Sequence, residues 1–216
     1  QRVPGKILLS GEYLVLDGAT ALGLVSRHGQ SLSVETDAMA KPGTLRWTAL
    51  DMEGKPWMEA VLILENGRWS LDADSAEVPE NQRLMQGLQA AWDLASEKQT
   101  VESSPTTSSK QSPATSLAHT GLRVTTSLEF PRRWGLGSSS TLIALLAEWW
   151  GIDARRLYAM VQNGSGYDLE IALSGRSMLY NREPLQIQPL DFRIPPGSLL
   201  RLVDPGSKQI SSAEVS

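Results

Sequence analysis

The sequence of 216 residues contains no cysteine and only two histidines. Without cysteine there is neither a disulfide framework nor a thiolate that could act as a nucleophile. His28 and His119 stand far apart in the chain, so a histidine-rich metal site is not predicted. These absences exclude disulfide-stabilised scaffolds and thiolate chemistry.

A long apolar run and an excess of positive charge are also missing. No run could span a bilayer and no signal peptide is found, so we expect a cytoplasmic protein without a membrane partner. The formal net charge of −4 argues against a nucleic-acid partner, which usually requires a basic surface. The length allows one large domain or two small ones. Because the chain begins at Gln1 and not at Met, we expect a few leading residues to be missing.

The feature that is present, between Pro131 and Trp150, is a glycine-rich turn joined to an apolar helical pattern. Glycine permits backbone angles that let the main chain lie close to a ligand. Three serines follow where the helix should begin, and a helix N-terminus has unpaired N–H groups and partial positive charge. The pattern predicts an anion site, best suited to phosphate. Its residues are Gly135, Leu136, Gly137, Ser138, Ser139 and Ser140.

A plain turn before a buried helix explains the same pattern, because glycine-rich turns before helices are common. The turn is not a Walker loop, since no Gly-Lys-Ser/Thr follows four residues after a glycine. It is not a dinucleotide fingerprint either, because the third glycine and a surrounding βαβ unit are missing. From this pattern alone, phosphate binding and a plain turn both stay open.

Two short strands are predicted near the N-terminus, at 7–9 and 13–16, with a break at Ser10-Gly11. Lys6 and Glu12 are the charged residues among apolar neighbours in this region. Since charged side chains are mostly exposed, the simplest interpretation makes both of them solvated residues on strand faces.

Alternating and helical patterns predict the other elements. Strands are predicted at 30–35, 44–50, 57–64, around Trp69, and at 121–130, 177–180, 185–187 and 198–203; helices are predicted at 79–96, 138–150 and after Asp153. Residues 100–120 are about half serine and threonine, so we expect a surface excursion that is mobile at its centre. A further helix should begin at Ser211 or Ser212, close to where the chain stops, so we expect an interruption there.

A second glycine-rich segment, Gly164-Ser165-Gly166-Tyr167-Asp168, precedes a helical pattern that ends at Ser174. Asp168 therefore lies near a helix N-terminus, where a carboxylate is stabilised. Two interpretations are open: Asp168 caps this helix, or it is a carboxylate held beside the phosphate site.

Together, three segments resemble the GHMP kinase superfamily, whose members phosphorylate galactose, homoserine, mevalonate and phosphomevalonate. The segments are Pro4-Gly5-Lys6 with Gly11-Glu12-Tyr13, then Gly135 to Ser140, then Gly164-x-Gly166-x-Asp168. The resemblance spans almost the whole chain, and the three motifs in this order are far more specific than any one of them. The stretch PGKILLSGEYLVLDGATALGL is most similar to the mevalonate-pathway branch, the mevalonate and phosphomevalonate kinases.

The resemblance implies an α+β fold with two parts. Residues 1–180 would form the ATP-binding N-terminal domain, similar to ribosomal protein S5 domain 2. Residues 181–216 would begin a ferredoxin-like GHMP C-terminal domain. Members are usually longer and carry a glycine-rich third motif near the C-terminus, which is not found after Val203. We therefore expect an incomplete C-terminal domain.

The resemblance also implies roles for individual residues. The Gly135–Ser140 loop would wrap the ATP phosphates through its N–H groups, and Ser139 would supply a hydroxyl to Mg²⁺. Asp168 would be the catalytic base that takes the proton from the substrate alcohol. Lys6 would stabilise the alkoxide and the phosphoryl group in transfer.

Glu12 and Tyr13 would line the acceptor site. Many members have Gly-Glu-His at this place, so the resemblance carries no polar role over to Tyr13. The superfamily's additional Mg²⁺-binding glutamate is not assigned. Glu148 and Glu170 are candidates by position only.

The function implied is Mg²⁺-dependent transfer of the γ-phosphoryl group of ATP to a small-molecule alcohol or phosphate. Mevalonate is the favoured acceptor, within isoprenoid precursor synthesis. Transfer would be direct and in line, without a phosphoenzyme. The alternatives are a phosphomevalonate kinase, a diphosphomevalonate decarboxylase that also releases carbon dioxide, and a non-catalytic nucleotide-binding module. A homodimer is a further expectation.

Overall fold

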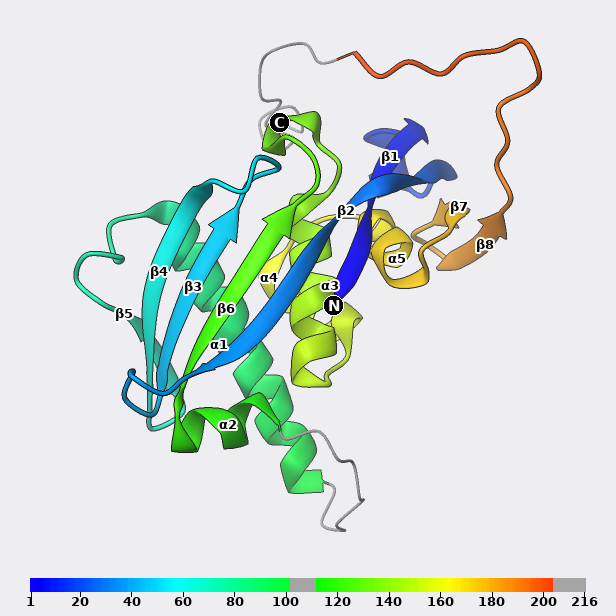
Figure 1. Ribbon diagram of the computed structural model, residues 1–216. Coiled ribbons are helices and arrows are strands. Elements are labelled where there is room, and N and C mark those ends of the chain that lie inside the picture. Colours follow the sequence, from blue (N-terminus) through cyan, green and yellow to red (C-terminus); the bar gives the residue numbers. More distant parts are fainter. Residues whose placement is uncertain (102–111, 204–216) are drawn as a thin grey trace.

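The computed structural model describes residues 1–101 and 112–203 (Figure 1). Most of the predicted elements lie where the sequence patterns placed them. The strands are β1 (Arg2–Ser10), β2 (Ala21–Asp37), β3 (Thr44–Leu50), β4 (Pro56–Glu65), β5 (Arg68–Leu71), β6 (Gly121–Leu128), β7 (Ser177–Asn181) and β8 (Gln186–Leu190). The helices are α1 (Pro79–Val101), α2 (Pro113–His119), α3 (Ser138–Trp150), α4 (Ala154–Val161) and α5 (Tyr167–Ser174), with short 3₁₀ helices η1 (Leu14–Asp17) and η2 (Arg132–Trp134).

The described strands join into one mixed sheet. Its order is β5-β4-β3-β6-β2-β7-β8, and β1 pairs with β2 outside this path. The pairs are antiparallel except β3 with β6, which run parallel. The mixed sheet with its helices confirms the α+β class. The division into two domains at residue 180 stays a prediction.

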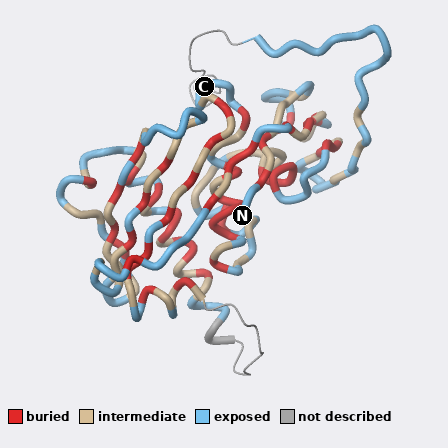
Figure 2. The backbone as a smooth tube through the Cα atoms, in the orientation of Figure 1, coloured by how far each residue is buried: buried red, intermediate tan, exposed pale blue. Residues whose placement is uncertain are grey.

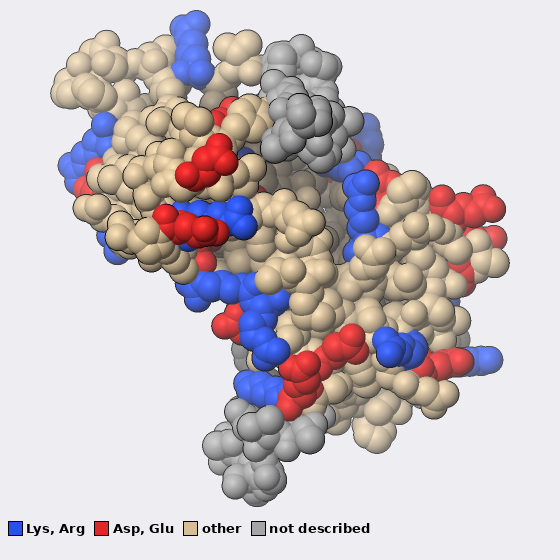
Figure 3. Space-filling view, turned by 180° about the vertical axis from the view of Figure 1, so that it is seen from behind, with Lys and Arg blue, Asp and Glu red and all other residues tan. Residues whose placement is uncertain are grey.

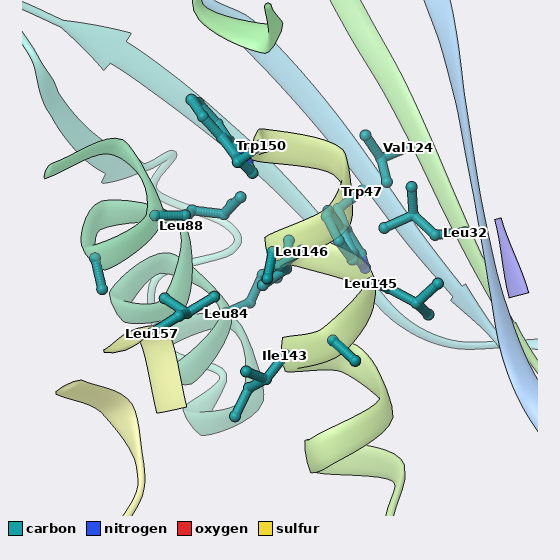
Figure 4. Close-up of a cluster of buried hydrophobic side chains, with 14 of the residues drawn as sticks. Leu32, Trp47, Leu84, Leu88, Val124, Ile143, Leu145, Leu146, Trp150 and Leu157 are labelled. Carbon is teal, nitrogen blue, oxygen red and sulfur yellow. The ribbon is translucent and has the colours of Figure 1, made fainter. Parts of the chain in front are cut away.

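Helices α1 and α3 pack on one face of the sheet, and α4 packs against both of these helices (Figures 1 and 2). Alternation along β3 explains this, because Leu45, Trp47 and Ala49 are buried while Arg46 between them is exposed. Figure 4 shows Trp47 and Leu145 meeting between the sheet and α3. Full burial of such a side chain contributes about 1.5–3 kcal/mol. This core holds α3 in place.

Helix α3 is bounded by glycines in the left-handed region. Gly137 before it has a φ of 85°, and Gly151 after it has a φ of 65°. Gly151 donates its N–H to the carbonyl oxygen of Glu148 and so ends the helix. Between the glycines, most positions are buried. The glycine-rich turn is therefore attached to the most deeply buried helix of the described chain.

The strand predicted at 13–16 is wrong. The chain forms η1 there, because local hydrogen bonds close a turn: Val15 N–H donates to Gly11 at 2.9 Å and Leu16 N–H donates to Tyr13 at 3.0 Å. Val15 is buried, which explains the apolar run without a strand.

Two predictions near the excursion and the C-terminus need correction. Part of the 100–120 stretch is helix α2, which begins because the Ser112 hydroxyl accepts the Thr115 N–H and Pro113 follows it. Residues 102–111 lie outside the described residues, so the mobility expected at the centre of the stretch stays a prediction. No strand forms at 198–203, where Leu199 is 71% exposed and the apolar residues find no strand to pair with. The helix predicted at Ser211 or Ser212 also lies outside the described residues.

The face of the molecule drawn in Figure 3 is mixed in charge. Figure 3 shows acidic and basic side chains interspersed on the face that it presents. No helix among residues 1–101 and 112–203 is long and apolar enough to cross a membrane.

Candidate functional site

Strand β1 lies directly against the glycine-rich turn that precedes α3. The Lys6 N–H donates to the carbonyl oxygen of Leu136 at 3.0 Å. A Cβ at Gly5 would stand only 2.6 Å from that same oxygen, so this approach requires glycine. The contact unites two of the motifs that the sequence analysis singled out, although they are far apart along the chain.

The turn itself uses two glycines with positive φ. Gly135 has a φ of 65° and Gly137 a φ of 85°, which side chains rarely permit. A Cβ at Gly137 would stand 3.1 Å from Cγ of Lys6. The Lys6 side chain therefore runs across Gly137, and the backbone of the turn is held against it.

The first turn of α3 has free main-chain donors. Gly137 is the N-cap and Ser138 is the first helical residue, so the helix begins at the serines as predicted. No side chain caps the helix, and Ser139 is exposed at its start. Ser140 is buried, and its Oγ has no hydrogen-bond partner among residues 1–101 and 112–203. A helix N-terminus that no side chain caps attracts an anion.

The ammonium group of Lys6 lies among ionisable groups. Its Nζ stands 5.2 Å from the centre of the Tyr167 ring. Burial lowers the pKa of Lys6, and the negative charges of Asp168 and Glu12 oppose that shift. The pKa of Tyr167 is raised chiefly by burial and then by the same two carboxylates. These four side chains therefore share one region of the molecule.

Asp168 is the second residue of α5. The N-cap is Gly166, with a φ of 87°, so Asp168 does not occupy the capping position. Its Oδ1 accepts the N–H of Leu169 at 3.0 Å. The loop before it is fixed from the side, because the Tyr180 hydroxyl donates to the carbonyl oxygen of Ser165. The carboxylate is thus carried on a short helix whose entry is held in place.

The two residues predicted to line the acceptor site lie beyond β1. Glu12 and Tyr13 are both exposed, and Tyr13 has a φ of 61°, rare for a residue other than glycine. The simplest interpretation of the sequence made Lys6 a solvated residue on a strand face. In the structure Lys6 is half-buried. Glu12 fits that interpretation by its exposure and still contributes charge near Lys6.

Comparison with known proteins finds similar structures but no similar sequences. Neither the protein-family models nor the curated proteins contain a match. Among solved structures, the chain is similar to Methanococcus jannaschii mevalonate kinase, with a TM-score of 0.58 and 13% identity, over 89% of this chain and 55% of that protein. It is also similar to Streptococcus pneumoniae phosphomevalonate kinase in complex with phosphomevalonate and AMPPNP, with a TM-score of 0.52 and 15% identity, over 85% and 50%.

A third similar structure is a D-glycero-D-manno-heptose 1-phosphate kinase from Bacteriodes thetaiotaomicron, with a TM-score of 0.55 and 15% identity, over 89% and 60%. The chain has the GHMP kinase fold. It spans between 50% and 60% of the length of these three proteins. At such identities the likeness concerns the fold, and the expected superfamily resemblance is confirmed at that level.

In this GHMP fold, neither candidate for an additional magnesium ligand lies free beside the turn. Glu170 is buried and receives two hydrogen bonds from Arg155, at 2.6 and 2.8 Å. Glu148 follows Ser138 by ten positions on α3, about 15 Å along the helix axis. Within the described ranges, no group of three His, Cys, Asp or Glu side chains could hold a metal. A magnesium ion here would depend on nucleotide phosphates, waters and Ser139.

A cavity of about 190 Å³ opens beside the first turn of α3, and no sequence pattern indicated it. It is shared between α1, α3 and strands β3, β4 and β6. Its walls are mostly apolar, and two buried polar side chains, Gln30 and Thr126, also line it. Gln30 Oε1 accepts a hydrogen bond from the Thr141 hydroxyl at 2.6 Å, which ties α3 to β2. Ser138 and Ser139 join the cavity to the turn.

Proposed function

We propose that this chain is the nucleotide-binding part of a GHMP kinase that transfers the γ-phosphoryl group of ATP to a small-molecule alcohol or phosphate. The observation that carries the proposal is the contact of Lys6 with the glycine-rich turn, with Asp168 nearby. The Lys6 backbone is hydrogen-bonded to Leu136, its side chain crosses Gly137, and its pKa responds to the Asp168 charge. A general-purpose turn would not require this meeting of three distant segments.

The residue types suit phosphoryl transfer, which needs positioning and charge neutralisation more than covalent chemistry. The uncapped first turn of α3 binds phosphate oxygens through its N–H groups. Lys6 supplies positive charge where negative charge develops. Asp168 accepts the proton of the acceptor hydroxyl as that hydroxyl attacks phosphorus. Transfer is direct, so the chain forms no phosphoenzyme.

Magnesium fits the donor set at the start of α3. Ser139 is exposed there and would contribute its hydroxyl, as the resemblance implies. When bound with the nucleotide, Mg²⁺ neutralises phosphate charge and helps to orient the phosphates. The chain's own contribution is one hydroxyl and a set of main-chain donors.

The base of the nucleotide has a place in the cavity beside Ser138 and Ser139. A nucleotide with its phosphates at the start of α3 would extend its base into this space. Apolar walls with a few convergent polar groups are typical of small-molecule sites. Gln30 and Thr126 supply those polar groups.

Mevalonate is the acceptor that we favour, within isoprenoid precursor synthesis, and phosphomevalonate is second. The support is the similarity of the N-terminal segment to the mevalonate-pathway branch and of the fold to mevalonate and phosphomevalonate kinases. Glu12 and Tyr13 would line the acceptor site at the exposed end of β1. The two-domain division at residue 180, the homodimer, the cytoplasmic location and the absence of nucleic-acid and membrane partners stay predictions.

A non-catalytic nucleotide-binding module is the second candidate. The observation in its favour is that the chain spans only 50–60% of the length of the similar kinases. The presence of both Lys6 and Asp168 beside the turn opposes it. A diphosphomevalonate decarboxylase on the same fold is separated from a kinase by the release of carbon dioxide.

The test is acceptor-dependent ADP release with ATP and Mg²⁺, using mevalonate, phosphomevalonate, diphosphomevalonate, galactose and homoserine in turn. We expect ADP and a phosphorylated product with one of the first two, without carbon dioxide. Carbon dioxide released together with ADP would favour the decarboxylase. ATP binding without turnover on any acceptor would favour the non-catalytic module and contradict the kinase.

A further inference from the structure

Arg132 is one of the residues that line the cavity that we assign to the nucleobase. It is the first residue of η2, which directly precedes the glycine-rich turn. Its guanidinium carbon stands 3.7 Å from the centre of the Trp57 ring. Its Nη2 lies 3.7 Å from Oε1 of Glu80, at the start of α1. All three side chains line the cavity, together with Ser138 and Ser139.

Trp57 is one of two tryptophans that line the cavity, and Arg132 occupies a face of its ring. A planar guanidinium at 3.7 Å is in stacking contact with the indole ring. Bases stack on aromatic side chains through the same face. A base therefore cannot lie on this face of Trp57 while Arg132 occupies it.

The side chains that line the cavity also include hydrogen-bond donors without a partner. The indole Nε1 atoms of Trp47 and Trp57 are buried and have no hydrogen-bond partner among the described residues. Buried N–H donors of this kind favour an occupant with acceptor atoms.

We propose that Arg132 is a placeholder for the nucleobase, which leaves Trp57 when the nucleotide enters and then pairs with its phosphates. This inference rests on the proposed nucleotide site. Arg132 precedes Gly135 by three residues, so its backbone is already next to the phosphate-binding turn. A guanidinium group forms paired hydrogen bonds with phosphate oxygens. When the Arg132 side chain moves from the Trp57 ring to the phosphates, its positive charge therefore still has a favourable partner.

The contacts that hold Arg132 on Trp57 are weak enough to be exchanged. The side chains of Arg132 and Glu80 are 40% and 38% exposed, and their separation of 3.7 Å is at the long end for an ion pair. A stacked base would replace one planar partner of Trp57 by another. The phosphates give Arg132 a stronger partner than Glu80.

The experiment separates the two halves of the nucleotide. Adenosine reports base binding alone, and inorganic tripolyphosphate reports the phosphate site alone. Binding of each to the full chain is measured by ligand-observed NMR. In Arg132→Ala we expect adenosine affinity to rise about two- to fivefold, the scale of one cation–π contact at an exposed site. We expect tripolyphosphate affinity to fall in the same variant.

Three further variants make the result specific. Arg132→Lys keeps the charge without a planar group, so adenosine should bind more tightly while tripolyphosphate binding is largely retained. Trp57→Ala should weaken adenosine binding and leave tripolyphosphate binding unchanged. Arg83→Ala is the matched control, since Arg83 lines the same cavity while the cation over the Trp57 ring is Arg132, and it should not raise adenosine affinity.

Unchanged or weaker adenosine binding in both Arg132 variants would overturn the placeholder, because Arg132 would then not compete with the base. The proposed function fails differently. If the wild-type chain binds neither ATP nor tripolyphosphate, the nucleotide site itself is wrong, and the inference falls with it.

Discussion

Lys6 is the residue through which the N-terminal strand enters the candidate site. Its position follows from main-chain geometry, since its N–H bonds to Leu136 and its side chain crosses Gly137. The motif resemblance singled out Lys6 and Asp168, and the Asp168 charge acts on Lys6 in the fold, while their catalytic roles stay predictions. Tyr167, over whose ring the Lys6 ammonium lies, was not indicated, because one tyrosine between Gly166 and Asp168 has no periodicity to distinguish it.

Deprotonation of Lys6 should make turnover fall at high pH; we call the pH of this fall the basic limit. Burial lowers its pKa, so its charge is lost at a pH below the usual value of about 10.4 for lysine. Turnover should fall as pH rises through this lowered pKa, because the uncharged amine cannot neutralise the phosphates. In Lys6→Arg the guanidinium stays charged, and the fall should move to higher pH.

The measurement is kcat as a function of pH for the wild type and Lys6→Arg. Lys55→Arg is the control, because the Lys55 side chain is 74% exposed, and its profile should match the wild type. If the basic limits of the wild type and Lys6→Arg coincide, Lys6 does not act through its charge.

At the scale of elements, hydrophobic periodicity predicts the bounds of a strand or helix best where one face of that element is buried. Strand β3 and helix α3 have the predicted bounds, since each alternates or repeats against a single core. The predicted strands at 13–16 and 198–203 are wrong, because no strand in the described part of the chain pairs with these apolar residues. Pairing depends on distant segments, which local patterns do not contain.

The turn before α3 should bind phosphate only with glycine at position 137. In Gly137→Ala the new methyl group meets Lys6 Cγ at 3.1 Å, on a backbone with a φ of 85°. We expect loss of tripolyphosphate binding, because either the turn or Lys6 must move. Isothermal titration measures it.

Gly151→Ala is the matched control at the opposite end of α3. It has a φ of 65°, and a Cβ there would meet nothing within 4 Å. It should lower the free energy of unfolding through backbone strain and leave tripolyphosphate affinity intact. Equal loss of binding in both variants would show that helix stability, and not the turn, decides phosphate affinity.

At the scale of the molecule, the core between the sheet and α1, α3 and α4 was predictable in outline, because its residues are the apolar faces of the predicted elements. The cavity beside α3 was not, since its lining residues, from Gln30 to Gln162, come together only in the fold. The order of the strands in the sheet could not be predicted from the sequence either, because the parallel pair β3–β6 joins segments separated by α1 and α2.

Leu145 should be a main support of this arrangement. It is fully buried on α3 against the sheet (Figure 4). Leu145→Ala should lower the free energy of unfolding by about 2–5 kcal/mol. Urea denaturation measures it, with Leu173→Ala as control because Leu173 is 42% exposed. Equal costs for the two variants would contradict the assignment of α3 to the core.

The most direct test of the central claim is Asp168→Asn, assayed for acceptor-dependent ADP release and for ATP affinity. The assay uses this chain and the longest natural protein that contains it. If Asp168 accepts the hydroxyl proton beside Lys6 and the glycine-rich turn, turnover should fall about 10²–10⁴-fold while ATP affinity stays nearly unchanged. Glu148→Gln, at the far end of α3, should have neither effect. Near-normal turnover in Asp168→Asn would contradict the role of Asp168 as the base. No turnover by the wild type with any acceptor would contradict the kinase activity itself.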